Sequence, residues 1–279
     1  MPEGDAVWRT ARRLHEALAG RTLVSADLRW PSLATARLGG LAVTEAVPRG
    51  KHILVRFGNG WTLHSHLRMD GSWRVEPTRP RPVSARRAPG RMSQGPGFVR
   101  AVLVTDQWTA VGVDLGMLDL VATDREDTLV GHLGPDLLDP GFDADRAVAN
   151  LAGAPGSIGA ALLDQTNLAG IGTIWASETL FAQRIAPWTP AAELPAETLA
   201  GIVERARVLL TASISAGMPN RAVHGRSGRP CRRCGTTVRV SPIGAIARER
   251  PMFYCPRCQG GLGPTDDGRP RAPLGSRPR

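Results

Sequence analysis

The four cysteines of this 279-residue chain all fall within one short segment near its C-terminus. Cys231 and Cys234 form one C-x2-C pair, Cys255 and Cys258 form a second, and twenty residues separate the pairs. This spacing is typical of a tetrahedral zinc ion held by four thiolates at two hairpin turns. Two disulfides are the alternative, but they are disfavoured in a chain that lacks the layout of an export signal. We therefore expect one structural zinc ion that folds a small C-terminal module.

The charge of the chain indicates an anionic partner. Its formal net charge is +10 at pH 7 and its pI is about 11.0, which favours nucleic acid over a small acidic molecule. A membrane is not expected as a partner, because no apolar stretch is long enough to span a bilayer and no lipidation signal is present. Charged residues also interrupt the N-terminal segment, so no signal peptide is expected. We predict a cytoplasmic, nucleoid-associated protein.

Lys51 is the single lysine among 35 lysine and arginine residues. Arginine stays protonated in proteins, whereas a lysine amine can shift its pKa and transfer a proton. This bias makes Lys51 a candidate for chemistry that arginine cannot perform. Chance is the alternative explanation for one lysine in so arginine-rich a chain.

The hydrophobic periodicity changes along the chain from strands to helices. Residues 2–19 repeat apolar side chains every three or four positions and end at Gly20, as an amphipathic helix does. Alternating apolar and polar residues then flank a Gly-Asn-Gly turn, and with further short strands they predict an antiparallel sandwich or barrel. From about residue 124 the pattern is helical. The Pro- and Arg-rich residues 77–97 and the tail 263–279 are too polar to pack, so we expect both to be flexible.

The chain begins with Met-Pro-Glu-Gly-Asp. Removal of Met1, which is usual when the second residue is small, gives Pro2 a free secondary amine at the start of the predicted helix. An α-amine has a pKa of about 8, so an appreciable fraction is unprotonated at neutral pH and can act as a nucleophile. The alternative is structural, because proline suits the first helical turn and Glu3 suits the positive end of a helix.

Two glycines separate helical stretches within residues 165–181. Gly170 and Gly172 form a G-x-G turn before the second stretch, where backbone N–H groups at a helix start can bind a phosphate. A plain helix–helix corner explains the same pattern. Three arginines between the cysteine pairs lie on a hairpin that is expected to meet nucleic acid: Arg239, Arg248 and Arg250.

These motifs together resemble one known family. MPEGD at the start, RGKHILV near residue 50, LGPDLL, LLDQTNLAGIGTIWASETLF and the cysteine segment are similar to the bacterial base-excision glycosylases, formamidopyrimidine-DNA glycosylase and endonuclease VIII. MPEGD and SHLRMDGSWRV look closer to endonuclease VIII, especially its actinobacterial relatives. The resemblance implies an α+β fold. An N-terminal helix and antiparallel β-sandwich would occupy 1–123, a helix-two-turns-helix domain 124–222, and a C-terminal β-hairpin zinc finger 223–262.

The resemblance also implies roles for individual residues. Pro2 matches the family's nucleophile, which attacks C1′ of the damaged nucleotide, expels the base and forms an iminium with the opened sugar. Glu3 matches the acid/base residue beside that sugar. Lys51 matches the hairpin lysine that contacts phosphate and donates a proton during β-elimination. Arg250 matches the zinc-finger arginine that contacts phosphate and assists δ-elimination, and no redox cofactor or catalytic metal is implied.

The chain departs from the family pattern at several positions. Thr173 stands where asparagine usually binds the phosphate at the lesion, and its hydroxyl has a shorter reach and fewer donors than an amide. Residues 116–118 replace an Arg-Phe pair that helps to fill the space of the flipped base in formamidopyrimidine-DNA glycosylase. Met69 lies where a wedge residue enters the base stack, with a core position as the alternative. His132, just before LGPDLL, either replaces a phosphate-contacting arginine or is a solvated surface residue.

We therefore predict a bifunctional DNA glycosylase and apurinic/apyrimidinic (AP) lyase that removes oxidised pyrimidines and cleaves the strand by β,δ-elimination. The partner is double-stranded DNA with oxidised bases or abasic sites, and one zinc ion is the only cofactor expected. An oxidised-purine glycosylase and a non-catalytic zinc-ribbon DNA-binding protein are the alternatives. Nothing in the sequence indicates an oligomer, so we expect a monomer.

Overall fold

The computed structural model of the protein describes residues 2–78, 98–216 and 221–269. Most of the insertion predicted at 77–97 and the end of the predicted tail, 270–279, therefore lie outside the described residues. The chain divides into two compact units. The N-terminal unit comprises Met1–Pro2 and Ala6–Gly131, and the C-terminal unit comprises Glu3–Asp5 and His132–Arg279. Each unit is described by itself below.

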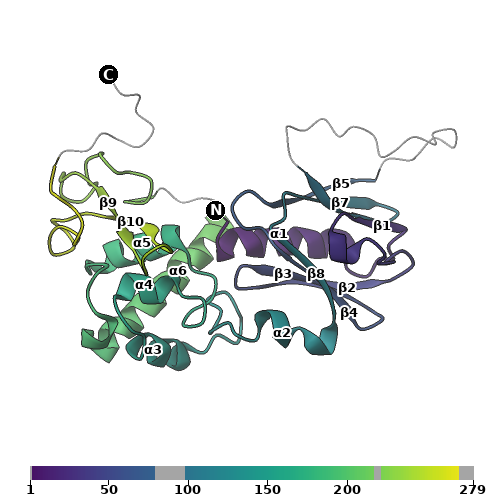
Figure 1. Cartoon of the computed structure of the whole chain (residues 1–279), viewed down its shortest axis with the longest axis horizontal. Helices are drawn as coiled ribbons and strands as arrows, with labels where there is room; N and C mark the ends of the chain where they lie inside the picture. Colours follow the sequence, from purple (N-terminus) through teal and green to yellow (C-terminus); the bar gives the residue numbers. More distant parts are fainter. Residues whose placement is uncertain (1, 79–97, 217–220, 270–279) are drawn as a thin grey trace, which may run out of the picture. The chain divides into compact units, whose positions relative to one another are not determined.

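The N-terminal unit contains one long helix and two four-stranded antiparallel sheets. Helix α1 (Gly4–Leu18) carries the apolar stripe that the sequence predicted, and Val7, Ala11, Leu14 and Leu18 are all fully or almost fully buried. Figure 1 shows β5 and β7 on one side of α1 and β2, β3 and β4 on the other. The first sheet has the order β1 (Ser25–Leu28), β6 (Val99–Val104), β7 (Trp108–Val113), β5 (Ser72–Pro77). The second has the order β2 (Val43–Arg49), β3 (His52–Phe57), β4 (Trp61–His66), β8 (Met117–Ala122).

The core of this unit lies between the sheets and the helix. Alternate residues of each strand point to opposite faces, and Ile53, Val55 and Leu63 join Leu14 of α1 in one buried cluster. The Gly-Asn-Gly segment forms the β3–β4 hairpin turn, where Gly60 adopts a φ of 81° that favours glycine. The short elements η1 (Pro31–Leu33), η2 (Thr123–Arg125) and α2 (Asp127–Val130) complete the unit.

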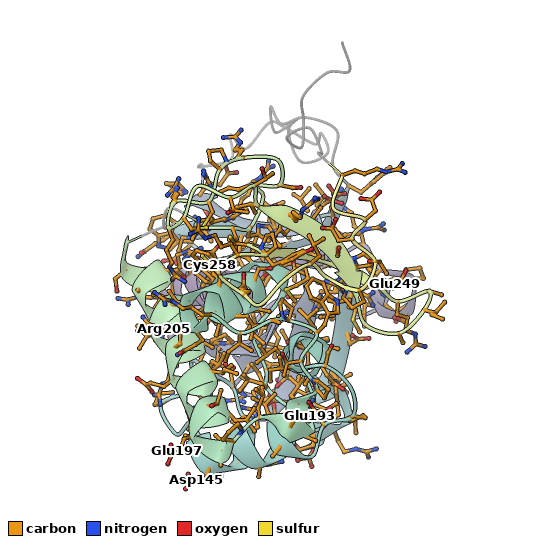
Figure 2. The ribbon with its side chains drawn as sticks, turned by 90° about the vertical axis from the view of Figure 1, so that its left-hand side faces the viewer. Asp145, Glu193, Glu197, Arg205, Glu249 and Cys258 are labelled. Carbon is orange, nitrogen blue, oxygen red and sulfur yellow. The ribbon has the colours of Figure 1, made fainter. Side chains whose placement is uncertain are left out.

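The C-terminal unit is built on helices. Its elements are α3 (Ala144–Ala152), α4 (Ile158–Leu163), α5 (Thr173–Gln183), η3 (Ala191–Glu193) and α6 (Ala196–Ala216). Helix α5 is buried around most of its circumference, and it packs against the apolar face of α6, where Leu199, Ile202 and Leu210 are completely buried. Figure 2 shows the opposite, charged side of α6, with Glu197 and Arg205 extending away from the unit. In the part of the chain that the structure describes, no helix combines the length and hydropathy needed to cross a membrane.

A two-stranded hairpin follows the helices. Strands β9 (Arg239–Ile243) and β10 (Arg250–Tyr254) pair in antiparallel register, and Glu249 lies at the outer end of the hairpin, away from α6 (Figure 2). The described residues after the last cysteine, 259–269, pack onto this hairpin. The hydroxyl of Tyr254 donates to Asp266 at 2.7 Å, and the buried Arg239 guanidinium pairs with the same carboxylate at 3.0 Å.

This packing corrects two sequence-based expectations. Residues 263–269 are held by Asp266 and do not start a flexible tail. Arg239 is only 7% exposed and neutralises Asp266, so this arginine does not present its charge to a nucleic-acid groove. A buried charge needs such a partner, whereas Arg248 and Arg250 are exposed.

Candidate functional site

The Glu3 side chain caps the N-terminus of α5. Its carboxylate accepts hydrogen bonds from the backbone N–H groups of Gly172 at 2.9 Å, Ile174 at 2.7 Å and Trp175 at 3.2 Å. The residue is 1% exposed. The first N–H groups of a helix lack partners within the helix, and the helix dipole adds positive potential there. Negative charge on Glu3 is therefore stabilised in one fixed place.

The two residues after Glu3 are fixed by the same unit. The N–H of Gly4 donates to the carbonyl of Gly170 at 2.8 Å. The buried carboxylate of Asp5 accepts from the indole N–H of Trp175 at 3.0 Å and from the hydroxyl of Ser213 at 2.9 Å. Three consecutive residues are thus held by α5, α6 and the turn that precedes α5. The nitrogen of Pro2 directly precedes this anchored tripeptide, so its freedom of movement is small.

The two glycines before α5 hold Glu3 and Gly4, and both of their N–H groups donate to side chains of the protein. Gly172 donates to Glu3, and the N–H of Gly170 donates to the side chain of Gln165 at 3.1 Å. This corrects the prediction that these two N–H groups bind a phosphate, because both are already used. Glycine is needed at 170 for a φ of 94°, and at 172 because a Cβ would come within 2.5 Å of the Glu3 carboxyl carbon.

Replacing Gly172 by Ala is expected to displace Glu3 and reduce the activity proposed below by about 10- to 100-fold, because small misplacements at a reacting centre are costly. The backbone at 172 is extended, so alanine causes no backbone strain and the protein will still fold. The measurement is single-turnover cleavage of a duplex with one abasic site. The matched control is Gly201→Ala in α6, where the added Cβ has only an ordinary contact at 3.7 Å. Equal rates for the two variants would contradict the prediction.

Helix α5 also holds the segment that precedes each cysteine pair. The carboxylate of Glu178 accepts from the N–H groups of Ala222, Val223 and His224 at 2.8–2.9 Å. The hydroxyl of Ser177 accepts from the N–H of Phe253 in β10 at 3.2 Å. These two side chains, which the sequence analysis did not single out, join the cysteine module to the helix that binds Glu3.

Arg250 begins strand β10. It lies opposite Ile243 of β9 and is exposed. Three residues further along the strand, Phe253 is fixed to α5 through Ser177. The backbone that carries Arg250 is therefore held, while its guanidinium extends to the surface as a contact for an anion requires.

The four cysteines form a single cluster of sulfur atoms. The Sγ atoms of Cys231, Cys234, Cys255 and Cys258 all lie within 4.8 Å of one another, and none of the four is in a disulfide. Zinc–sulfur bonds of about 2.3 Å in a tetrahedron place the sulfurs about 3.8 Å apart. Burial raises the pKa of the Cys255 thiol, and a bound cation would favour its ionised form. The donor set fits a closed tetrahedral ion with no position left for a substrate.

Lys51 lies in the two-residue turn between β2 and β3. Arg49 and His52 face each other across the turn, and Gly50 adopts a φ of 57°. Lys51 is half-buried. A tight hairpin turn on two well-formed strands gives this lysine a defined position within the N-terminal unit.

Three histidines, which the sequence analysis did not identify, cluster beside this turn. The rings of His52 and His64 stack with centroids 5.0 Å apart, and the rings of His52 and His66 meet edge to face at 4.8 Å. The sequence signal was the alternation of His64 and His66, which places both on one face of β4. This alternation could not reveal the cluster by itself, because the pairing of β3 with β4 is what brings His52 beside the other two histidines.

The stability of the protein is expected to fall as the pH drops from about 6.5 to about 4. Burial and the charge of Arg68 lower the pKa of His66 to about 4, and burial and Arg221 do the same for His224. Unfolding restores a pKa of about 6.5, so the unfolded state binds more protons than the folded state inside this window. Below pH 4 both states are protonated, and above pH 7 both are neutral. The expected loss is about 1–3 kcal/mol per histidine at pH 4.

Urea unfolding at pH 7 and pH 4.5 measures this loss. His66→Gln removes one of the histidines whose pKa is lowered in the folded protein, so its unfolding free energy should depend less on pH than that of the unaltered protein. The control is Val208→Ala at an exposed position of α6, which removes no ionisable group and should leave the pH dependence unchanged. Identical pH dependence in the His66 variant and the unaltered protein would show that this histidine does not titrate with unfolding.

The remaining predicted contacts lie at turns. Met69 is in the turn between β4 and β5 and is 61% exposed, so the alternative of a core position is excluded. The preceding residue, Arg68, adopts a φ of 54°, and its side chain occupies the space that a Cβ at Gly116 would need. His132 is exposed, and Thr173 is the first residue of α5.

Comparison with known proteins agrees with this architecture. The sequence model for "Formamidopyrimidine-DNA glycosylase N-terminal domain" matches residues 1–111. The model for "Formamidopyrimidine-DNA glycosylase H2TH domain" matches residues 133–222. The chain belongs to the formamidopyrimidine-DNA glycosylase family. This confirms the resemblance inferred from the motifs.

This member of the formamidopyrimidine-DNA glycosylase family has full-length relatives. It is 48% identical to "Probable endonuclease 8 2" of Streptomyces coelicolor, with 100% of each chain covered. It is 37% identical to "DNA-(apurinic or apyrimidinic site) lyase Nei2" of Mycolicibacterium smegmatis, covering 93% of this chain and 99% of that protein. The solved structure of Lactococcus lactis formamidopyrimidine-DNA glycosylase bound to DNA containing an AP site has a TM-score of 0.76, at 22% identity, over 92% of this chain and 99% of that chain. The last comparison shows the fold, and it confirms the predicted α+β class.

Proposed function

We propose that this chain is a bifunctional DNA glycosylase and AP lyase of base excision repair that uses the Pro2 amine as its nucleophile. The observation that carries the proposal is the anchoring of residues 3–5. The chain immediately after Pro2 is fixed by three sets of contacts: the three backbone donors to the Glu3 carboxylate, the Gly4–Gly170 hydrogen bond and the buried contacts of Asp5. An N-terminus with no chemical role does not need to be anchored at three consecutive residues. Curated relatives named endonuclease 8 and AP lyase support the same reaction class.

The chemistry follows from an unprotonated secondary amine. The Pro2 nitrogen attacks C1′ of the damaged nucleotide, the N-glycosidic bond breaks, and the base leaves with a proton. Cleavage of the C1′–O4′ bond then gives an iminium between Pro2 and the opened sugar, and Glu3 exchanges protons beside it. The cationic iminium acidifies the C2′ proton, so its loss expels the 3′-phosphate, and a second elimination expels the 5′-phosphate.

The other predicted residues act on the phosphates and the base stack. Lys51 contacts phosphate and donates a proton during β-elimination, and Arg250 contacts phosphate and assists δ-elimination. The hydroxyl of Thr173, at the start of α5, donates a hydrogen bond to a DNA phosphate, and His132 contacts the DNA backbone. Met69, exposed at the end of a hairpin, enters the base stack when the damaged nucleotide turns out.

The substrates we propose are oxidised pyrimidines in double-stranded DNA. Two features support this choice. The relatives with the higher identities carry the name endonuclease 8, and Gly116 leaves no side chain where a purine-specific enzyme places an arginine. One zinc ion bound by the four cysteines would hold the hairpin of Arg250 and take no part in the reaction. We expect a monomer that works on chromosomal DNA in the cytoplasm.

The test is covalent trapping on defined lesions. The purified protein is incubated with duplexes that carry thymine glycol, dihydrouracil, 8-oxoguanine or an abasic site, with borohydride present to reduce the iminium. Adducts on the pyrimidine lesions and the abasic site are expected. Adducts on 8-oxoguanine but not on the pyrimidines would instead assign the purine specificity. No adduct on any duplex would leave a DNA-binding protein without the enzyme activity.

A further inference from the structure

A chain of hydrogen bonds runs across three strands of the second sheet and ends beside Lys51. His52 Nδ1 and His64 Nε2 are 2.7 Å apart, and His64 Nδ1 and Asp119 Oδ2 are 2.9 Å apart. In the sheet register, His52 lies opposite His66, and His64 lies opposite Asp119. Directly opposed residues share a face and residues two apart on a strand do too. The four side chains therefore form one row on one face of the sheet.

The protons of this row have a fixed order. A carboxylate only accepts, so His64 must donate its Nδ1–H to Asp119. His64 is completely buried, and burial lowers its pKa, so the ring stays neutral and its Nε2 is an acceptor. His52 then donates its Nδ1–H to His64. Asp119, which is 38% exposed, thereby sets the tautomer and orientation of both rings.

This arrangement stabilises the pairing of the strands less than apolar side chains would. Burying polar rings costs free energy that a pair of apolar side chains would not incur, and the opposite face of the same strands uses Ile53 and Leu63. The row also ends at a particular place, because His52 is the first residue after the turn that bears the only lysine of the chain. The position of the polar row thus indicates that it serves the lysine and not the stability of the sheet.

We propose that Asp119 and His64 are positioning residues that orient His52 and, through it, the turn of Lys51. The inference rests on the proposed function, in which Lys51 donates a proton during β-elimination. Without the carboxylate, the two rings lose their unique tautomers and the turn samples more than one orientation. The lysine amine then meets the sugar in the right geometry less often, although the turn and its charge remain.

The main variant is Asp119→Asn, which keeps the shape and removes the charge. It is expected to slow single-turnover cleavage of abasic-site DNA by about 10- to 100-fold. Covalent trapping of the same DNA by borohydride depends on Pro2, so its rate should stay within about twofold of the unaltered protein. The dissociation constant for DNA should also change by less than about twofold. The charge-matched control is Asp106→Asn, an exposed position in the turn between β6 and β7.

A second pair of variants separates positioning from packing. His64→Gln keeps a donor for Asp119 and an acceptor for His52, so it should restore most of the cleavage rate. His64→Leu fills the same volume without hydrogen bonds and should behave like Asp119→Asn or worse. Nitrogen-15 spectra of the unaltered protein should show His52 and His64 as Nδ1–H tautomers. This spectroscopic test does not require any variant to fold.

The outcomes distinguish this inference from the function on which it rests. If the unaltered protein neither traps nor cleaves DNA, the proposed function fails. If it does both and Asp119→Asn cleaves at the normal rate, the positioning role is overturned. Equal losses of trapping and cleavage would overturn it too, since they indicate general damage to the fold. An Nε2–H tautomer at His64 would reverse the order of donors and would also overturn it.

Discussion

A protein whose Pro2 nitrogen is acylated is expected to bind abasic-site DNA normally but to form no covalent adduct with it. Inserting Glu between Met1 and Pro2 prevents removal of the initiator methionine and turns the secondary amine into an amide. An amide nitrogen is not a nucleophile, so base removal and strand cleavage should fall by at least about three orders of magnitude, as losses of a catalytic nucleophile do. Borohydride trapping and single-turnover cleavage measure the loss.

The companion variant is Pro2→Gly, which keeps an α-amine but makes it primary and conformationally freer. Base removal should be strongly reduced, while zinc content and DNA affinity stay nearly unchanged. The contacts of Glu3, Gly4 and Asp5 do not involve the proline ring, so the fold should be preserved. Pro31→Gly is the control, because it removes an exposed proline at the start of a short helix. Normal cleavage by the Pro2 variant would show that the nucleophile lies elsewhere.

Elements with a strong local pattern were predictable from the sequence. The stripe of Val7, Ala11, Leu14 and Leu18 predicted both the type and the buried face of α1, because apolar residues that repeat every 3.6 positions share one face only in a helix. The cysteine spacing likewise predicted a cluster whose sulfur atoms do meet. In both cases all of the information lies within a few turns or hairpins of the chain.

Contacts between distant segments could not be predicted in this way. The glycines at 170 and 172 suggested a phosphate site, but the constraint on Gly172 is Glu3, which is about 170 positions away in the sequence, and Gly170 is needed for its positive φ. Nothing near either glycine encodes that contact. The same holds for His64, whose partner Asp119 depends on the pairing of β4 with β8, and for Arg239, which is neutralised by Asp266. A local pattern gives the residue types at a site, and long-range register decides what they do.

Removal of zinc is expected to abolish strand cleavage and unfold the hairpin of β9 and β10. The free energy that zinc supplies to small cysteine modules is about 10–16 kcal/mol at neutral pH. The apolar cluster around the cysteines is small and includes the cysteines themselves, so it cannot replace that contribution. Cys255→Ser should have the largest effect among the four, because Cys255 is completely buried and oxygen is a poorer ligand for zinc than sulfur. Cleavage should fall by about 100-fold or more, since Arg250 loses its support.

Arg250→Ala separates the loss of the arginine from the loss of the fold. Arg250 is exposed and lies outside the sulfur cluster, so this variant should keep one zinc ion per chain and its native thermal transition while δ-elimination slows. Zinc is counted by atomic absorption, and the two elimination products are resolved on a denaturing gel. Cys255→Ser should lose both the zinc and the activity, because the sulfur cluster stabilises β10, the strand that carries Arg250. A purified protein with two disulfides and no zinc would contradict the assignment, since oxidised sulfurs cannot bind the ion.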